Sequence, residues 1–190
     1  MNKYTRHYEE NVTIPTDSQA KIDANSKFII GRYNVVIKNT PEAIWEYAYN
    51  PTTWTASNAE EHLGLVFYDE TDRPETGVAF YQKEKVAGVY SDLKGYILWA
   101  EKPKVCIWFG IGRYKLFGFI PLDMPVSGVL ELKPIHDGTR MSHTLYGHYP
   151  DTFVGRLFFV VNKRLSEKAG HVTHAYKELL FFKKNLDIKK

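Results

Sequence analysis

VGRLFFVVNKRLSEKAGHVTHAYKELL, residues 154–180, is the stretch that decides the fold expected for this chain. Apolar residues recur in it every three or four positions, which places them on one side of an α-helix. These are Val154, Phe158, Val161, Leu165, Ala169, Val172, Tyr176, Leu179 and Leu180. The opposite side carries Lys163, Glu167, His171, His174 and Glu178. The spacing predicts a long amphipathic C-terminal helix of about 40 Å, which needs a broad apolar surface to lie on.

The bulk properties of the chain are those of a single domain. It has 190 residues, which are enough to bury a core without disulfides or a structural metal. Its one cysteine, Cys106, lies in an apolar strand pattern and is expected to pack rather than react. The N-terminus has no apolar stretch of a signal peptide, so we expect a cytoplasmic protein.

The N-terminal half predicts an extension, a strand and two short helices. Residues 1–26 are polar and show no regular period, whereas residues 27–38 alternate in the manner of a strand. Asn39-Thr40-Pro41-Glu42 is typical of a helix start. We expect a short helix over 43–49 and a second helical piece over 52–61.

Strand patterns separated by turn signals follow one another from His62 to His148. They cover residues 63–68, 77–84, 92–101, 105–114, 126–133 and 139–148. Consecutive strands with short connections predict an antiparallel meander. Residues 116–125 interrupt the pattern and are interpreted as an irregular insert.

The dipeptide Asp137-Gly138 predicts a hairpin and a register. With these two residues as the loop, Leu132 lies opposite His143. The apolar face of this hairpin then carries His143 toward the long helix, and it leaves Tyr146 and His148 on the outer face.

Three local stretches in this order of elements resemble the START-like superfamily, also called SRPBCC. They are Val35 to Glu46 at the junction of strand and helix, Tyr49 to Trp54 at the helix end, and Glu131 to Ser142 at the last hairpin. The resemblance covers about residues 28–184. It implies an α+β helix-grip fold, in which a curved antiparallel sheet of six to seven strands wraps around the C-terminal helix, with two short helices after the first strand. We therefore expect a polar extension over 1–26 and one START-like domain over 27–187.

The resemblance implies an apolar ligand held between sheet and helix, so residues that point inward are the candidates for its site. His143 is the candidate for acid/base catalysis, although a histidine on an apolar face is more often a hydrogen-bonded core residue. Tyrosine or arginine would have to assist it, and rings from neighbouring strands would form apolar walls. The predicted ligand-binding set is Tyr33, Tyr81, Tyr96, Trp99, Trp108, Phe109, Arg113, Met141, His143, Phe158, Leu165 and Val172.

Other partners and cofactors are less well supported. Glu167, His171, His174 and Glu178 share a helix face at metal-like spacing, but that face is predicted to be exposed, so we expect ion pairs there and neither a metal nor another cofactor. The net charge of +3 is too small for a nucleic-acid surface. Basic residues prevail after Arg156, which fits a solvated helix face or a transient contact with a membrane surface.

The sequence thus favours a protein that binds a hydrophobic small molecule or lipid in a cavity between sheet and helix. One alternative is an enzyme of the polyketide cyclase or aromatase kind, which would use the same cavity for acid/base catalysis without a metal. The other is a protein-interaction adaptor with a closed pocket. Phosphate-binding, serine-hydrolase and zinc-peptidase motifs do not occur in the sequence.

Overall fold

One antiparallel sheet and three helices make up the described part of the chain. The computed structural model describes residues 27–68, 72–86, 89–116, 120–148, 153 and 171–187. The strands are β1 (Lys27–Ile37), β2 (His62–Phe67), β3 (Ala79–Val86), β4 (Val89–Glu101), β5 (Val105–Leu116), β6 (Ile120–Ile135) and β7 (Gly138–His148). The helices are α3 (Pro41–Ala48), α4 (Pro51–Ser57) and α6 (His171–Leu186).

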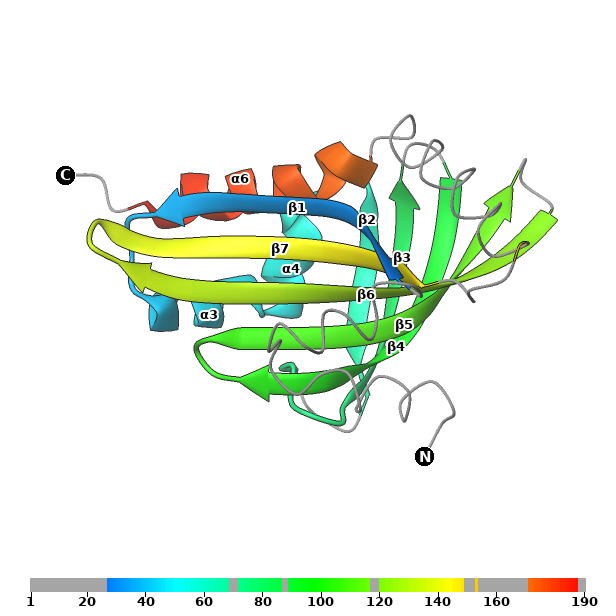
Figure 1. Ribbon diagram of the computed structural model, residues 1–190, viewed down its shortest axis with the longest axis horizontal. Helices are drawn as coiled ribbons and strands as arrows, with labels where there is room; N and C mark the ends of the chain where they lie inside the picture. The colour runs from blue at the N-terminus through cyan, green and yellow to red at the C-terminus, as the bar shows by residue number, and fades with distance from the viewer. Residues whose placement is uncertain are drawn as a thin grey trace.

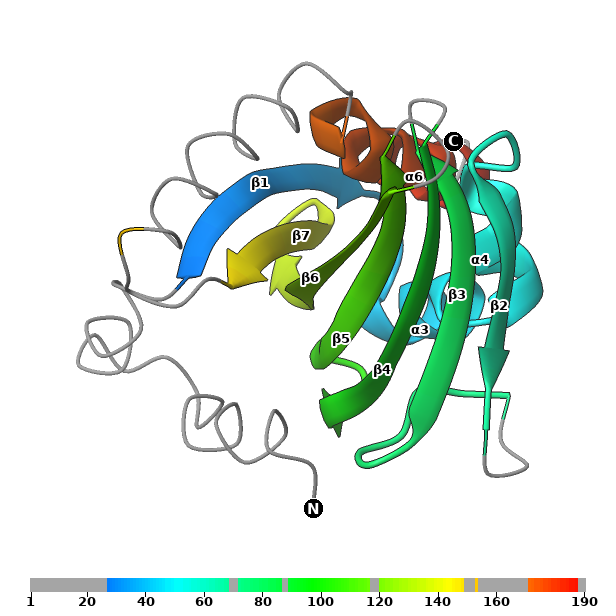
Figure 2. The same ribbon diagram turned by 90° about the vertical axis from the view of Figure 1, so that its right-hand side faces the viewer.

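The sheet is the seven-stranded meander expected from the strand patterns. Its order is β1-β7-β6-β5-β4-β3-β2, so only β1 and β7 are joined without being consecutive in the chain. The sheet curves strongly, and α3, α4 and α6 all lie on its concave side (Figure 1 and Figure 2). The expected α+β class and element order are therefore confirmed. The predicted extension over 1–26 and the first half of the C-terminal helix lie outside the described residues, and the domain limits 27–187 stay a prediction.

The first short helix, α3, begins where its capping signal predicts, and α4 begins one residue before the predicted helical piece. The Thr40 hydroxyl accepts a hydrogen bond from the Ala43 amide at 3.3 Å, and Pro41 takes the first helical position. Asn50 caps α4 in the same way, accepting from the amides of Thr52 and Thr53. Because a cap satisfies amides that have no partner within the helix, these short sequences determine both helix starts locally.

The register of the β6–β7 hairpin differs from the prediction by two residues. Leu130, not Leu132, is paired with His143, and Ile135 is paired with Gly138. Gly138 has a φ of 138°, and a Cβ atom there would lie 2.3 Å from the carbonyl oxygen of Ile37. A shift by two residues keeps every side chain on its face. His143 therefore points inward as predicted.

The predicted insert over 116–125 is wrong, because β5 continues to Leu116 and β6 begins at Ile120. Two prolines suggested an irregular segment. Pro121 is paired with Lys115 and Pro125 with Ile111, whereas the pairing of β6 with β7 begins only at Val126. Among the described residues this part of β6 is paired with β5 alone, and proline is tolerated in strands that lack a partner on one side.

Helix α6 turns a different face to the sheet from the one predicted. Tyr176 and Leu180, assigned to the inner stripe, are exposed, whereas His174 and Glu178, assigned to the solvent side, are buried. Ala175, Leu179 and Phe182 on the same helix are completely buried as well. The prediction failed because it assumed that charged residues face water, whereas these two find their partners inside the protein.

The C-terminal end of α6 is fastened to the end of β1. The Lys38 amide donates to Asp187 Oδ1 at 2.7 Å, and Lys183 Nζ donates both to the Val36 carbonyl and to Asp187 Oδ2. Burial acts to raise the pKa of Asp187, but the hydrogen bonds from Lys183 and Lys38 outweigh it, so the pKa is lowered.

Replacing Asp187 with asparagine is expected to lower the free energy of unfolding by about 1 kcal/mol at neutral pH. Because folding lowers the pKa of Asp187, its contribution is complete above the unfolded value of 3.8 and is lost as the pH falls through the folded value. Urea unfolding at pH 7 and pH 3 should therefore show that wild type and variant differ less in their free energy of unfolding at pH 3 than at pH 7. A difference independent of pH would show that charge is not its cause.

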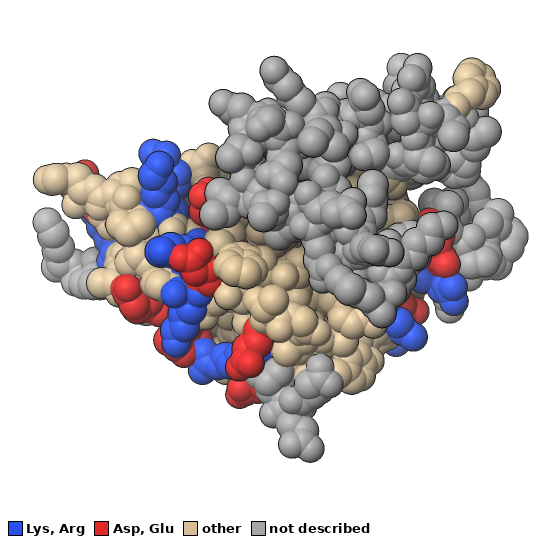
Figure 3. Space-filling view, turned by 60° about the horizontal axis from the view of Figure 1, so that its bottom comes forward, with Lys and Arg blue, Asp and Glu red and all other residues tan. Residues whose placement is uncertain are grey.

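Charged groups on the described surface lie in mixed groups. Glu46, for example, contacts both Arg73 and Lys102. On the face drawn in Figure 3, basic and acidic side chains adjoin each other instead of forming separate fields. Among the helices in the described residues, none combines the length and the apolar composition needed to cross a membrane.

Candidate functional site

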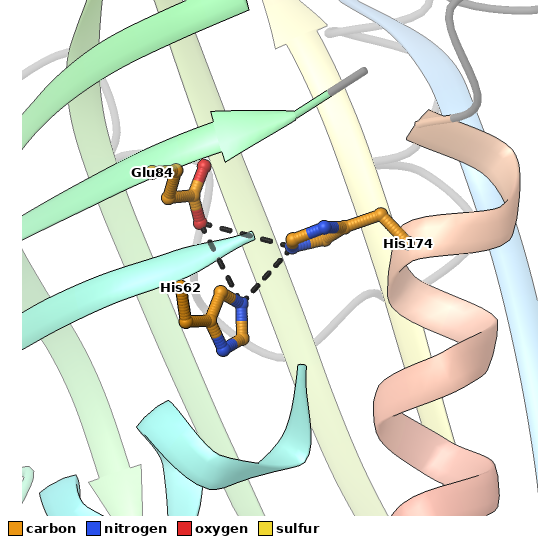
Figure 4. A group of neighbouring side chains, drawn as sticks. All are labelled: His62, Glu84 and His174. Carbon is orange, nitrogen blue, oxygen red and sulfur yellow. Dashed lines mark hydrogen bonds and ion pairs between the residues drawn. The ribbon is translucent and has the colours of Figure 1, made fainter. Parts of the chain in front are cut away.

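Two histidines and two glutamates converge at the N-terminal end of described α6. His174 and Glu178 are four residues apart and so lie on one helix face. His62, the first residue of β2, is paired with Glu84 on β3, and a bulge follows His62. Figure 4 shows His62, Glu84 and His174 pointing toward a common centre. A cross-strand pair thus meets a helical pair, although the two lie about a hundred residues apart in the sequence.

Glu178 is the centre of this cluster. Its Oε1 atom lies 3.1 Å from His62 Nε2 and 3.1 Å from His174 Nε2. Its Oε2 atom accepts a hydrogen bond of 3.1 Å from Nδ1 of His143 on β7. Glu178, His62, His143 and His174 are all at most 5% exposed. One carboxylate therefore holds three buried imidazoles.

Hydrogen bonds on the far side of each ring determine the tautomers. His62 Nδ1 donates to the Trp54 carbonyl at 2.9 Å, which requires a proton on that nitrogen. His174 Nδ1 lies 2.6 Å from Glu61 Oε2 and 3.0 Å from Asn58 Nδ2. A carboxylate only accepts, so the shorter contact assigns the proton to His174 Nδ1, while Asn58 donates to Glu61 at 2.7 Å. Both Nε2 atoms are then directed inward, 3.0 Å from each other.

The carboxylates make this buried centre favourable for positive charge. Burial acts to lower the pKa of His174, but the hydrogen bond and charge of Glu178, with Glu84 and Glu61, raise it to about 10. The pKa of His62 is also raised, because Glu178 and Glu84 outweigh burial. Burial alone would raise the pKa of Glu178, but the three histidines bring it well below its usual value. The centre therefore demands protons or a cation.

A cavity of about 110 Å³ lies between the sheet and the helices, with this cluster at one end. Most of its wall is apolar, and His143, His174, Glu178, Glu84 and Gln82 form the polar part. The apolar wall includes Ala48, Leu65, Phe67, Phe80, Leu93, Ile97, Trp108, Met124, Val126, Leu130 and Leu145. Such an apolar hollow with a few convergent polar groups is typical of a site for a small organic molecule.

Within the described part of the chain, three buried polar atoms of the cavity wall have no hydrogen-bonding N or O partner. They are Trp54 Nε1, His143 Nε2 and the Tyr49 hydroxyl. The Tyr49 hydroxyl has the Cys106 thiol beside it; burial first, and then this thiol, raise its pKa well above 10.0. Trp54 Nε1 is a donor, and His143 Nε2 is an acceptor because Nδ1 carries the proton. Buried polar atoms without partners are costly, so they mark a place where a ligand gains hydrogen bonds.

Of the residues predicted to bind a ligand, the structure places His143 and Trp108 in the cavity wall. Phe158 and Leu165 lie outside the described residues, as does the side chain of Val172. The others lie away from the cavity wall, namely Tyr33, Tyr81, Tyr96, Trp99, Phe109, Arg113 and Met141.

Physical reasons for these positions are visible in the contacts. Tyr96 and Trp99 are exposed, at 40% and 44%, on the convex face of the sheet. Phe109 packs there with Leu98 and Ile107 in a second apolar cluster. The prediction grouped these rings by strand without knowing their faces.

The polar partners suggested for His143 are engaged elsewhere. Tyr81 donates to Asp92 at 2.5 Å, which, ahead of burial, raises the pKa of Tyr81 to about 12. Arg113 forms two hydrogen bonds of 2.8 Å with Asp123 on the surface. Tyr33 is paired with His143 across β1 and β7, but its ring packs near Tyr176 at 5.9 Å. Cys106 is buried, which raises the pKa of its thiol to about 12, in keeping with a packing role.

Several residues of the site were not predicted from the sequence to belong to it. Glu178 and His174 were noticed for their spacing but assigned to solvent, and Tyr146 was assigned to the outer face although it lines the cavity. His62, Glu84 and Trp54 carried no signal. The cross-strand position of His62 and Glu84 would have needed the register of β2 and β3, which the turn between them does not specify.

Comparisons with known proteins agree on the architecture. A Mesorhizobium loti protein matches with a TM-score of 0.54 and 15% identity over 83% of this chain and 94% of its own. A conserved Geobacillus kaustophilus protein matches with a TM-score of 0.54 and 14% identity, and covers 82% of this chain and 93% of its own. A Rhodobacter sphaeroides protein matches with a TM-score of 0.54 and 16% identity, and the match covers 85% of this chain and 93% of its own.

The chain has the helix-grip fold that the resemblance implied. The likeness spans more than nine tenths of each neighbour and more than four fifths of this chain. At these identities the likeness concerns the fold alone. No protein-family model matches the sequence, and no curated protein matches it either. The function of this helix-grip protein therefore has to be argued from its own cavity.

Proposed function

We propose that this helix-grip protein binds a hydrophobic small molecule or a lipid segment in the cavity between the sheet and α6. The observation that carries the proposal is an apolar hollow of about 110 Å³ whose wall contains buried polar atoms without partners. A closed, fully packed interior, as the adaptor alternative requires, would not leave this hollow. An apolar cavity of about 150 Å³ in another protein holds benzene, so the scale fits a small ring or a short acyl segment.

The polar atoms favour a ligand that carries a hydroxyl group on an apolar body. Trp54 Nε1 can donate to the oxygen of such a group, and His143 Nε2 can accept its proton. The two rings meet edge to face with centroids 6.1 Å apart, so both polar atoms belong to one part of the cavity wall. Burial of the apolar body would supply affinity of about 25 cal/mol per Å² before ordering costs, and the hydroxyl would set the orientation.

A pair of matched probes tests this proposal, namely 4-ethylphenol and ethylbenzene. Isothermal titration should show that the purified protein binds 4-ethylphenol about tenfold or more tightly than ethylbenzene, since the hydroxyl satisfies buried polar atoms. Native mass spectrometry of gently purified protein should in addition show a co-purified apolar compound. Failure of both probes to bind, with nothing co-purified, would contradict the proposal.

Replacing Val126 with phenylalanine should fill the cavity and weaken 4-ethylphenol binding by about tenfold or more, while the protein stays folded. Val126 is buried, lines the cavity and lies on β6. The same substitution at Val129 is the matched control. Val129 lies on the same strand but packs against the cluster on the opposite face. Equal binding by both variants would place the ligand elsewhere.

The enzyme alternative has one observation in its favour. His143 has a carboxylate on Nδ1 and an unpartnered Nε2 at the cavity wall, which is the arrangement of an oriented general base. Glu178 thus takes the position that the sequence analysis gave to a tyrosine or an arginine. This alternative, cytoplasmic location and transient contact with a membrane surface all stay predictions; identifying the bound compound is the first step toward testing the enzyme.

A further inference from the structure

The buried cluster contains three acceptor atoms that face one another. They are His62 Nε2, His174 Nε2 and Glu178 Oε1, separated pairwise by 3.0, 3.1 and 3.1 Å. Each imidazole has its proton on the opposite nitrogen, held by the Trp54 carbonyl or by Glu61. With no second proton on either ring, three lone pairs point into one small space, which is repulsive unless protons or a metal cation lie between them.

A fourth acceptor completes the group. Glu84 Oε1 lies 3.8 Å from both Nε2 atoms, and it comes from a strand on the side opposite the helix. Around a tetrahedral Zn²⁺ with bonds of about 2.0–2.1 Å, neighbouring ligand atoms lie about 3.3–3.4 Å apart. The five measured separations, from 3.0 to 3.8 Å, bracket this value. His62, Glu84 and His174 also place one ligand atom each within 4.8 Å of one another.

We propose that His62, His174, Glu178 and Glu84 form a binding site for a divalent transition-metal ion of the Zn²⁺ class. A set of two neutral imidazoles and two carboxylates favours such an ion over Mg²⁺ or Ca²⁺, because Mg²⁺ and Ca²⁺ prefer ligands that are all oxygen. The site lies at the polar end of the cavity, but the inference does not depend on the organic ligand proposed above.

The surroundings of the four residues are those of a prepared metal site. His62 donates its other nitrogen to a backbone carbonyl and His174 to a carboxylate, which are the two usual partners of metal-binding histidines. Glu178 Oε2 accepts a hydrogen bond from His143 Nδ1, and Gln82 donates one to Glu84. These contacts hold the rings and carboxylates in place, so little ordering remains to be done when an ion binds.

Charge balance points the same way. Glu178 is 2% exposed, and its ion-pair partners within the described residues are histidines rather than lysine or arginine. The same holds for Glu84, whose ion-pair partners in that part of the chain are His62 and His174. When the Nε2 atoms of His62 and His174 carry no proton, the two carboxylates leave a buried negative charge, which is costly. A divalent cation that takes the place of those protons would neutralise it.

A zinc titration tests the site. The 190-residue chain is treated with a chelator, desalted and titrated with ZnCl₂ in the presence of a competing zinc indicator. We expect one equivalent to bind with a dissociation constant below about 1 μM and to raise the thermal midpoint. His62→Gln and His174→Gln should each weaken binding by about 100-fold. His136→Gln is the control, because His136 is a hairpin histidine with a 98% exposed side chain. Wild type that binds zinc no better than His62→Gln would overturn the proposal and leave a proton-sharing cluster.

Cobalt substitution keeps the test decisive if the glutamine variants do not fold. Co²⁺ bound to wild type in a tetrahedral site of nitrogen and oxygen ligands should give intense visible absorption, which one equivalent of Zn²⁺ abolishes. Weak absorption typical of six-coordinate Co²⁺ would mean surface binding and would contradict the proposal. Because 4-ethylphenol binding is measured separately, failure of the metal site can be distinguished from failure of the ligand cavity.

Discussion

Replacing Glu178 with alanine is expected to lower the free energy of unfolding of the chelator-treated protein by about 3–5 kcal/mol. Glu178 is 2% exposed and pairs with His62, His143 and His174. Its removal leaves the buried His143 Nδ1–H without its acceptor and takes the carboxylate at 3.1 Å away from both His62 and His174. Urea unfolding followed by circular dichroism measures the loss.

Lys177→Ala is the matched control for this variant. Lys177 is the exposed neighbour of Glu178 on α6, so its replacement tests the effect of alanine on the helix alone. Alanine favours helix, and a surface substitution of this kind should change stability by no more than about 0.5 kcal/mol. If Glu178→Ala lowered the free energy of unfolding no more than Lys177→Ala, the carboxylate would not be the centre of the buried cluster.

The second large effect is expected for Phe182→Ala, which should lower the free energy of unfolding by about 3–5 kcal/mol. Phe182 is completely buried and packs against the rings of Tyr47, Trp54 and Phe181. Truncation removes this contact and leaves a void between α6 and the short helices. The midpoint and slope of urea unfolding separate a loss of stability from a change in compactness.

Leu180→Ala provides the comparison on the same helix. Leu180 was predicted to face the sheet but is 42% exposed, so its truncation should cost less than about 1 kcal/mol. The two variants together test the observed orientation of α6. A larger cost for Leu180 than for Phe182 would restore the stripe predicted from the sequence and would contradict the observed burial.

Local signals in the sequence determined the order and the type of the elements. Thr40-Pro41 and Asn50-Pro51 begin helices because their side chains and proline rings satisfy the first turn without help from the rest of the protein. Asp137-Gly138 determined a hairpin, and period-two alternation determined strands. These features depend on residues within a few positions of each other, so they are accessible from the sequence. The helix-grip architecture itself was expected from the resemblance to the START-like superfamily.

Tertiary structure alone decided which face α6 turns inward and which residues meet at the site. Hydrophobic periodicity places His174 and Glu178 in water, because it treats every charged group as one that must stay hydrated. Inside the protein they meet His62, more than a hundred positions away, and His143, thirty-five residues before Glu178. Sheet pairing and helix packing bring these partners together, and their hydrogen bonds and charges offset the cost of burying a charged group. Spacing along the chain contains no information about such long-range contacts.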